Sequence, residues 1–135
     1  MLGKVFRSAC LGSLAFLSLW TTVVACEEGV SDGLRLDSGD STMWLEPDPT
    51  TQKVGQLFGM KIELCDGEGS VKQVNATMPA HGHGMNYRPK VSQVTPGLFE
   101  AQGLLFHMPG SWQLSIEVLN NGEKTVFQKD VMILP

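Results

Sequence analysis

Apolar and polar residues alternate along most of the chain after residue 56. In the first such run the apolar positions are Phe58, Met60, Ile62 and Leu64. Later runs with the same alternation cover residues 71–78, 90–94, 98–106, 111–119 and 124–134. Because successive side chains of a strand point to opposite faces, a period of two predicts half-buried strands.

Turn signals separate these runs. They are Asp66-Gly67-Glu68-Gly69, Thr95-Pro96-Gly97, Pro109-Gly110 and Asn120-Asn121-Gly122. About seven short strands with such turns predict an all-β chain, an immunoglobulin-like antiparallel β-sandwich. A short apolar run at residues 43–45 adds a strand, which Pro47 is expected to end. Lys129 interrupts the apolar face of the last strand, which predicts a bulge or an edge position there.

The N-terminal segment has the pattern of a targeting sequence. Lys4 and Arg7 precede an uncharged apolar run over residues 9–25. This run is short for a stable membrane span, so residues 1–25 are predicted to be a signal peptide, with a retained membrane anchor as the alternative. Residues 23–26, Val-Val-Ala-Cys, resemble a bacterial lipobox, and that resemblance implies a lipid on Cys26. Ordinary signal cleavage is the alternative.

These features predict the organisation of the rest of the chain. Residues 26–41 are polar and are expected to form a flexible, lipid-anchored tether, and residues 42–135 the folded domain. The expected location is extracytoplasmic, in the periplasm or at the cell surface, with the lipid membrane as a partner through Cys26. If Cys26 carries no lipid, it can form a disulfide with Cys65; otherwise Cys65 is a lone thiol.

Charge and motif content exclude several function classes. The formal net charge is −4, and it becomes −6 when Lys4 and Arg7 leave with the signal peptide. An acidic domain is a poor partner for nucleic acid. The sequence has no nucleophile elbow, phosphate-binding loop or paired-carboxylate pattern, so we do not expect an enzyme.

Histidine and methionine concentrate in two places. The first is residues 78–85, Met-Pro-Ala-His-Gly-His-Gly-Met, and the second is His107-Met108. If residues 90–94 form a strand, the chain runs away from the first cluster, turns at Pro96-Gly97 and runs back along residues 98–106. The second cluster then lies beside the first. If residues 90–94 are loop, the clusters lie a strand length apart, about 20 Å or more. The strand is favoured because it avoids an unusually long loop.

The residue types at this end indicate copper. His81, His83 and Met85 are spaced by two, and glycines between them let the backbone bend toward a ligand. With His107 and Met108 they offer imidazole nitrogen and thioether sulfur, a soft donor set that suits copper better than zinc, calcium or magnesium. A blue-copper centre would need a thiolate, and Cys65 is predicted at the far end. Met78 follows the inward alternation and is expected in the core.

A family resemblance covers most of the folded part. Residues 78–85, Gly97-Leu98-Phe99 and the run 106–112, Phe-His-Met-Pro-Gly-Ser-Trp, resemble the YtkA-like domain, which is related to FixH-type proteins. The resemblance implies an extracytoplasmic immunoglobulin-like sandwich. A weaker similarity to copper chaperones of the PCuAC type lies in the chemistry only, because the order of the motifs differs.

The sequence therefore predicts an extracytoplasmic copper-binding protein with a metallochaperone or copper-handling role. Its metal ligands are His81, His83, Met85, His107 and Met108, and its partner is a copper-receiving or copper-donating protein. The alternative is a binding or assembly module without metal, which uses the same loops as a protein interface.

Overall fold

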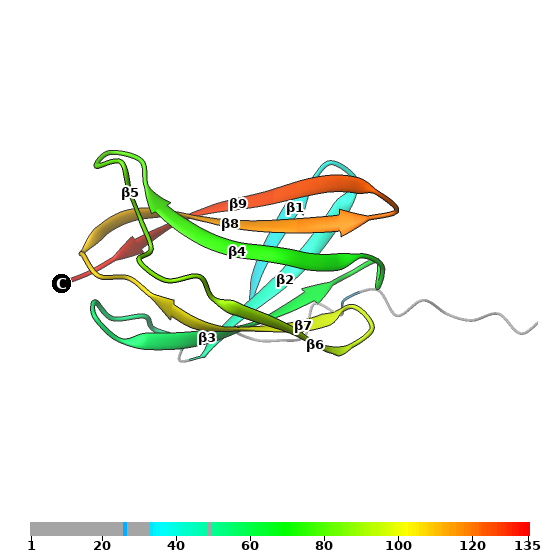
Figure 1. The fold of residues 1–135 in the computed structure, drawn as a ribbon, viewed down its shortest axis with the longest axis horizontal. Helices are drawn as coiled ribbons and strands as arrows, with labels where there is room; N and C mark the ends of the chain where they lie inside the picture. The colour runs from blue at the N-terminus through cyan, green and yellow to red at the C-terminus, as the bar shows by residue number, and fades with distance from the viewer. Residues whose placement is uncertain (1–25, 27–32, 49) are drawn as a thin grey trace, which may run out of the picture.

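The computed structural model describes residues 26, 33–48 and 50–135 of the 135-residue chain. The predicted signal peptide and the tether residues 27–32 lie outside the described residues. The described part is a sandwich of two antiparallel sheets (Figure 1). The all-β, immunoglobulin-like prediction is confirmed. No helix in this part is both long and apolar enough to span a bilayer.

Each sheet has its own set of strands. The five-stranded sheet runs, in spatial order, β1 (Leu34–Ser38), β2 (Ser41–Asp48), β3 (Leu57–Leu64), β7 (Leu98–Leu105) and β6 (Lys90–Thr95). The four-stranded sheet runs β5 (His83–Gly84), β4 (Ser70–Met78), β8 (Gly110–Asn120) and β9 (Glu123–Ile133). The chain passes from one sheet to the other between β3 and β4, between β5 and β6, and between β7 and β8.

The core is formed by the inward-facing side chains of both sheets. The apolar positions of the two alternating runs that form β3 and β8 are all buried: Phe58, Met60, Ile62, Leu64, Trp112, Leu114, Ile116 and Val118. No polar or charged residue in the described ranges is buried. Burial of apolar side chains between the sheets is the main term that favours this fold.

The predicted tether is partly wrong, because the folded domain begins before residue 42. Residues 34–38 form β1, which pairs with β2 from Leu34↔Leu45 to Ser38↔Ser41. Leu36 is buried, and Gly39 takes a φ of 60° in the turn that joins the two strands. The strand was not predicted because the alternation Leu34-Arg35-Leu36-Asp37 is short and its neighbours on both sides are mostly polar.

The expected break at Pro47 is also wrong, since β2 continues through Pro47 to Asp48. Pro47 is paired with Met60 of β3, while the ladder between β1 and β2 extends only as far as Leu45. The last residues of β2 therefore have a partner strand on one side only. Proline, which lacks an N–H donor, is tolerated at such an edge.

A bulge in β7 determines which of its residues face inward. The register between β3 and β7 shifts between Phe58↔Leu104 and Gly59↔Gln102, which leaves Gly103 as the extra residue. Gly103 has a φ of 87°, a conformation that favours glycine. Before the bulge Ala101 faces the core, and after it Leu104 and Phe106 do. The shift puts Phe106 in the core and leaves the next residue, His107, at the rim.

Two further expectations about strands are confirmed. Residues 90–95 form β6, which pairs with β7 in an antiparallel ladder. β4 and β7 therefore finish at the same end of the sandwich, the left-hand end in Figure 1. Lys129 lies on β9, the edge strand of its sheet, and the ladder with β8 has no bulge. A lysine at an inward-facing position of an edge strand disfavours pairing of that strand with a strand of another chain.

Candidate metal centre

The first histidine cluster lies on a short hairpin between β4 and β5. Met78 pairs with His83 across the turn of residues 79–82, and the His81 N–H donates to the Met78 carbonyl at 3.1 Å. Gly82 takes a φ of 63°, which allows the turn. The Met85 N–H donates to the Ala76 carbonyl at 3.0 Å. His83 is thus held in a paired segment, whereas His81 lies in the turn.

The second cluster lies on the link between β7 and β8. Phe106, the first residue of this link, is buried. Trp112, two residues after the start of β8 at Gly110, is fully buried. The Trp112 Nε1–H donates to the Met108 carbonyl at 3.0 Å. This bond closes the link onto β8, so the position of His107-Met108 is fixed by a buried residue. The alternation over residues 111–119 is consistent with an inward-facing Trp112, but it does not indicate this hydrogen bond.

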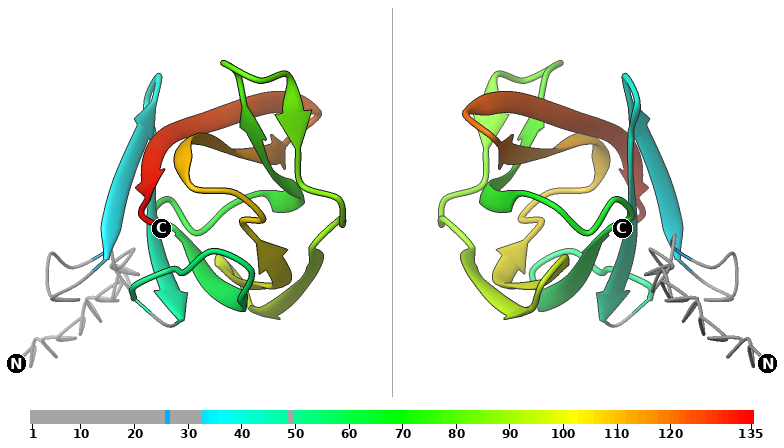
Figure 2. Two further views of the ribbon diagram at one scale, coloured as in Figure 1. Left: turned by 90° about the vertical axis from the view of Figure 1, so that its left-hand side faces the viewer. Right: turned by 90° about the vertical axis from the view of Figure 1, so that its right-hand side faces the viewer.

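The two clusters meet at the end of the sandwich that faces the viewer in the left panel of Figure 2. The rings of His83 and His107 have centroids 6.4 Å apart and are nearly perpendicular, at 74°. The rings of His81 and His83 have centroids 6.1 Å apart and are almost parallel, at 14°. The structure therefore brings all three histidines together, and the prediction that β6 would do so is correct.

His107 carries an unsatisfied polar atom. Its Nδ1 is buried and has no hydrogen-bond partner. Its ring contacts Trp112 at 5.1 Å between centroids and 82° between planes. Buried polar atoms in proteins are nearly always paired, so an exception needs an explanation such as a catalytic role or an ion. The described residues contain no other buried side-chain nitrogen or oxygen in this condition.

The methionines of the two clusters have different surroundings. Met78 is 2% exposed and belongs to the core, as predicted. Its Cε atom lies only 2.9 Å from where a Cβ would stand on Gly110, so the end of β4 and the start of β8 touch next to the two clusters in the chain. Met85 and Met108 are half-buried and pack against the core from its margin. Their role as ligands stays a prediction.

The spacing of the rings can be compared with what a bound ion requires. A metal about 2 Å from one nitrogen of each of two imidazoles keeps their centroids at most about 6.5 Å apart. Both measured separations, 6.1 and 6.4 Å, are just inside that limit. In the described part of the chain, however, no three His, Cys, Asp or Glu side chains gather closely enough to hold a metal. The arrangement fits two adjacent histidine pairs better than one three-histidine centre.

The charge around this end disfavours hard cations. No aspartate or glutamate occurs in residues 69–99 or 101–116, the segments that carry both clusters. Calcium and magnesium sites are built from carboxylate and other oxygen atoms. Imidazole and thioether are the chemically distinctive donors that these segments supply.

Cys65 lies at the opposite end, as predicted. It follows the last residue of β3, whereas Leu57 at the start of β3 pairs with Leu105, close to His107. Eight residues of extended chain separate the two ends, about 25 Å. The site therefore has no thiolate within reach.

Cys65 is joined to Cys26 by a disulfide bond. This was one of the two states that the sequence left open. A sulfur atom in a disulfide cannot also carry a lipid through a thioether. Lipidation of Cys26 stays a prediction, and it would require this bond to be absent.

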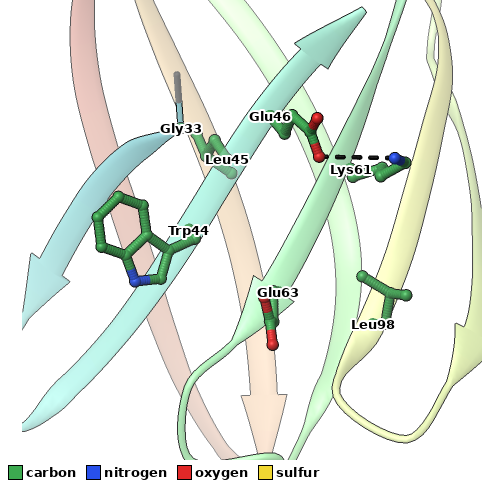
Figure 3. A pocket seen from close by; sticks show the side chains of 7 residues that line it. All are labelled: Gly33, Trp44, Leu45, Glu46, Lys61, Glu63 and Leu98. Carbon is green, nitrogen blue, oxygen red and sulfur yellow. Dashed lines mark ion pairs between the residues drawn. The ribbon is translucent and has the colours of Figure 1, made fainter. Parts of the chain in front are cut away.

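The outer face of the five-stranded sheet has a small hollow, shown in Figure 3. Its volume is about 40 Å³, and it lies beside Trp44, Leu98 and the ion pair between Lys61 Nζ and Glu46 Oε2, which are 3.5 Å apart. That volume holds only a few water molecules. The hollow is on a different face from the histidines and is too small for an organic ligand.

Comparisons with known proteins identify no relative of this chain. No protein-family model, no curated protein and no solved structure matches this chain.

Proposed function

We propose that the protein binds a copper ion at the histidine and methionine end of the sandwich and passes it to a partner protein. The observation that carries the proposal is the buried, unpartnered Nδ1 of His107, whose ring lies 6.4 Å from that of His83. Leaving a buried nitrogen without a partner costs about 1–3 kcal/mol. A bound ion would remove that cost.

The donor types favour copper among the common metals. Imidazole binds copper in both oxidation states, and the thioethers of Met85 and Met108 favour Cu(I). A site without thiolate is unsuited to blue-copper electron transfer. The exposure of His81 and His83 suits an ion that is taken up and released more than one that is kept for redox catalysis.

The location proposed for this activity is extracytoplasmic. The disulfide between Cys26 and Cys65 supports it, because such bonds persist in oxidising compartments. The apolar segment at residues 9–25 supports export, and the resemblance to the YtkA-like domain agrees with both. Attachment to a membrane through Cys26 is proposed for molecules in which this sulfur is not bonded to Cys65.

The proposal is tested by competition for Cu(I). The full chain, purified in detergent under anaerobic conditions, is titrated against the chelator bicinchoninate. We expect the protein to retain one copper ion and the double variant His81→Ala/His83→Ala to bind about 100-fold more weakly, a loss of about 2.7 kcal/mol. Pro79→Ala, which changes the same turn without removing a donor, is the control. Equal and negligible copper retention by wild type and double variant would refute the proposal.

A second candidate function is a protein interface without metal. Several large apolar residues at or near this end are exposed: Leu57 at 67%, Tyr87 at 59%, Met132 at 65% and Leu134 at 71%. Exposed apolar groups that gather on one part of a surface often mark a contact with another protein. The copper titration separates the two candidates, since an interface alone predicts no competition with the chelator.

A further inference from the structure

The three histidine rings form a row. His83 stands between the other two, with centroids 6.1 Å from His81 and 6.4 Å from His107. Among the described residues, the ring contacts of His81 end at His83, while the row continues from His107 to Trp112. His83 is therefore the one residue that can share an ion with either neighbour.

Exposure increases along this row. His107 is half-buried, with its Nδ1 shielded from solvent, whereas His83 and His81 are exposed. An ion between His107 and His83 would lie against the sandwich. An ion between His83 and His81 would lie in reach of another protein.

Backbone anchoring decreases in the same direction. His107 follows the buried Phe106 and is held by the bond from Trp112 to Met108. His83 belongs to the ladder between β4 and β5. His81 lies in the turn between them, next to Gly82, around which a side chain would meet nothing within 4 Å. The outer ring is therefore the one with most freedom to move toward a partner.

We propose that one copper ion has two overlapping positions here, an inner holding position between His83 and His107 and an outer transfer position between His83 and His81. This inference rests on the proposed function and adds the route by which the ion leaves. It also accounts for the lack of a three-residue metal cluster in the described chain.

Transfer between the positions needs no change of oxidation state. The bond from Cu(I) to His107 breaks as a lone pair on His81 forms a new bond to the ion, while His83 stays bonded. Two donor atoms of the partner then replace His81 and His83 in turn. Each step forms one metal–ligand bond and breaks one, so the ion keeps its charge throughout.

The two positions predict different effects for the three histidines. His83→Ala removes both positions and should weaken Cu(I) binding about 100-fold, as much as the double variant does. His107→Ala removes the inner position and should lower the equilibrium affinity by at least about tenfold while release becomes faster. His81→Ala removes the outer position only, so it should leave the affinity within about threefold of wild type but slow transfer at least about tenfold.

The test measures affinity and rate on the same samples. The full chain in detergent is loaded with one equivalent of Cu(I); affinity is read by competition with bicinchoninate, and transfer by stopped-flow mixing with excess bathocuproine disulfonate. Pro79→Ala controls for changes in the turn. Because His81 and His83 are exposed, their variants should fold, and urea unfolding checks this for all of them.

Slow transfer at unchanged affinity in His81→Ala would support the two positions. Equal losses of affinity in His81→Ala and His107→Ala would overturn them in favour of one three-histidine site, and would leave the copper function intact. Unchanged transfer in His81→Ala would also overturn them. If wild type binds no Cu(I), the proposed function itself fails, and this inference with it.

Discussion

The ring of His107 stands edge-on against the ring of Trp112, with 5.1 Å between centroids and 82° between planes. The same indole donates its N–H to the carbonyl of Met108. One fully buried residue thus positions both members of the second cluster. The positions of the candidate ligands His107 and Met108 therefore depend on the packing of the core around Trp112.

Substitution Trp112→Phe should weaken the fold and the site together. Phenylalanine keeps an aromatic ring but has no donor for the Met108 carbonyl, which would lose its partner. We expect the free energy of unfolding to fall by about 1–3 kcal/mol. Copper affinity should fall as well, because the link between β7 and β8 would no longer be held to β8. Urea denaturation and chelator competition measure the two effects.

Trp44→Phe is the matched control. Trp44 lies on the outer face of the other sheet, where its Cε3 atom would be 3.1 Å from a Cβ on Gly33 (Figure 3). This substitution should leave copper affinity unchanged. Equal copper affinity in wild type and Trp112→Phe would show that the indole does not position the site.

Gly103→Ala should destabilise the protein through the backbone. A Cβ at this position would meet nothing within 4 Å, so the cost is that of a φ of 87° in a residue with a side chain, about 1–2 kcal/mol. Gly84→Ala is the control, since its Cβ would make only ordinary contacts and its φ is not positive. Thermal or urea unfolding gives the difference, and a Gly103→Ala protein as stable as wild type would mean that the bulge does not need glycine.

Much of the fold could be predicted from the sequence because the strands are half-buried. In a run such as Met60-Lys61-Ile62-Glu63-Leu64 the apolar residues are buried and the charged residues are exposed, and this difference produces the alternation. β6 is largely exposed, and its strand was favoured because it avoids a long loop; this choice predicted that His83 meets His107. Where the alternation was short, as at Leu34-Arg35-Leu36, the strand was missed, and at Pro47 the end of β2 was placed too early.

The details of the site could not be predicted in the same way. The bulge at Gly103 changes which residues face inward. The sequence does not show that this single glycine has a positive φ. The orientation of the His107 ring depends on Trp112, which is a contact between side chains and not a sequence pattern. The sequence could therefore predict which residues meet, but not that they form a row with unequal exposure.

The carboxyl group of Asp37 should respond to a change at Thr42. The Thr42 hydroxyl donates to Asp37 Oδ1 at 2.7 Å, and this bond, more than the neighbouring Arg35, holds the pKa of Asp37 below its ordinary value of 3.8. The stabilisation is present above the ordinary value and disappears as the pH falls through the lowered pKa. Thr42→Val should raise the pKa of Asp37 in an NMR titration, whereas Thr42→Ser should not. An unchanged pKa in Thr42→Val would contradict this assignment.

The state of Cys26 can be read chemically. The disulfide closes a loop between residues 26 and 65 and should contribute about 2–4 kcal/mol. Cys65→Ser and reduction should therefore lower the urea midpoint to a similar extent. If some molecules carry labelled palmitate on Cys26, the Cys65 thiol in those molecules should react with a maleimide. A lipid-labelled fraction in which Cys65 is fully protected would place the lipid on another atom.

The central claim is that imidazole and thioether groups of one end of the sandwich hold copper, and X-ray absorption at the copper edge tests it most directly. The full chain loaded with one equivalent of Cu(I) should show imidazole scattering together with a sulfur neighbour at about 2.3 Å, taking zinc–sulfur distances as a guide. In Met85→Leu/Met108→Leu the sulfur should disappear while the imidazole scattering stays. A spectrum without imidazole, or a protein that retains no copper, would contradict the account.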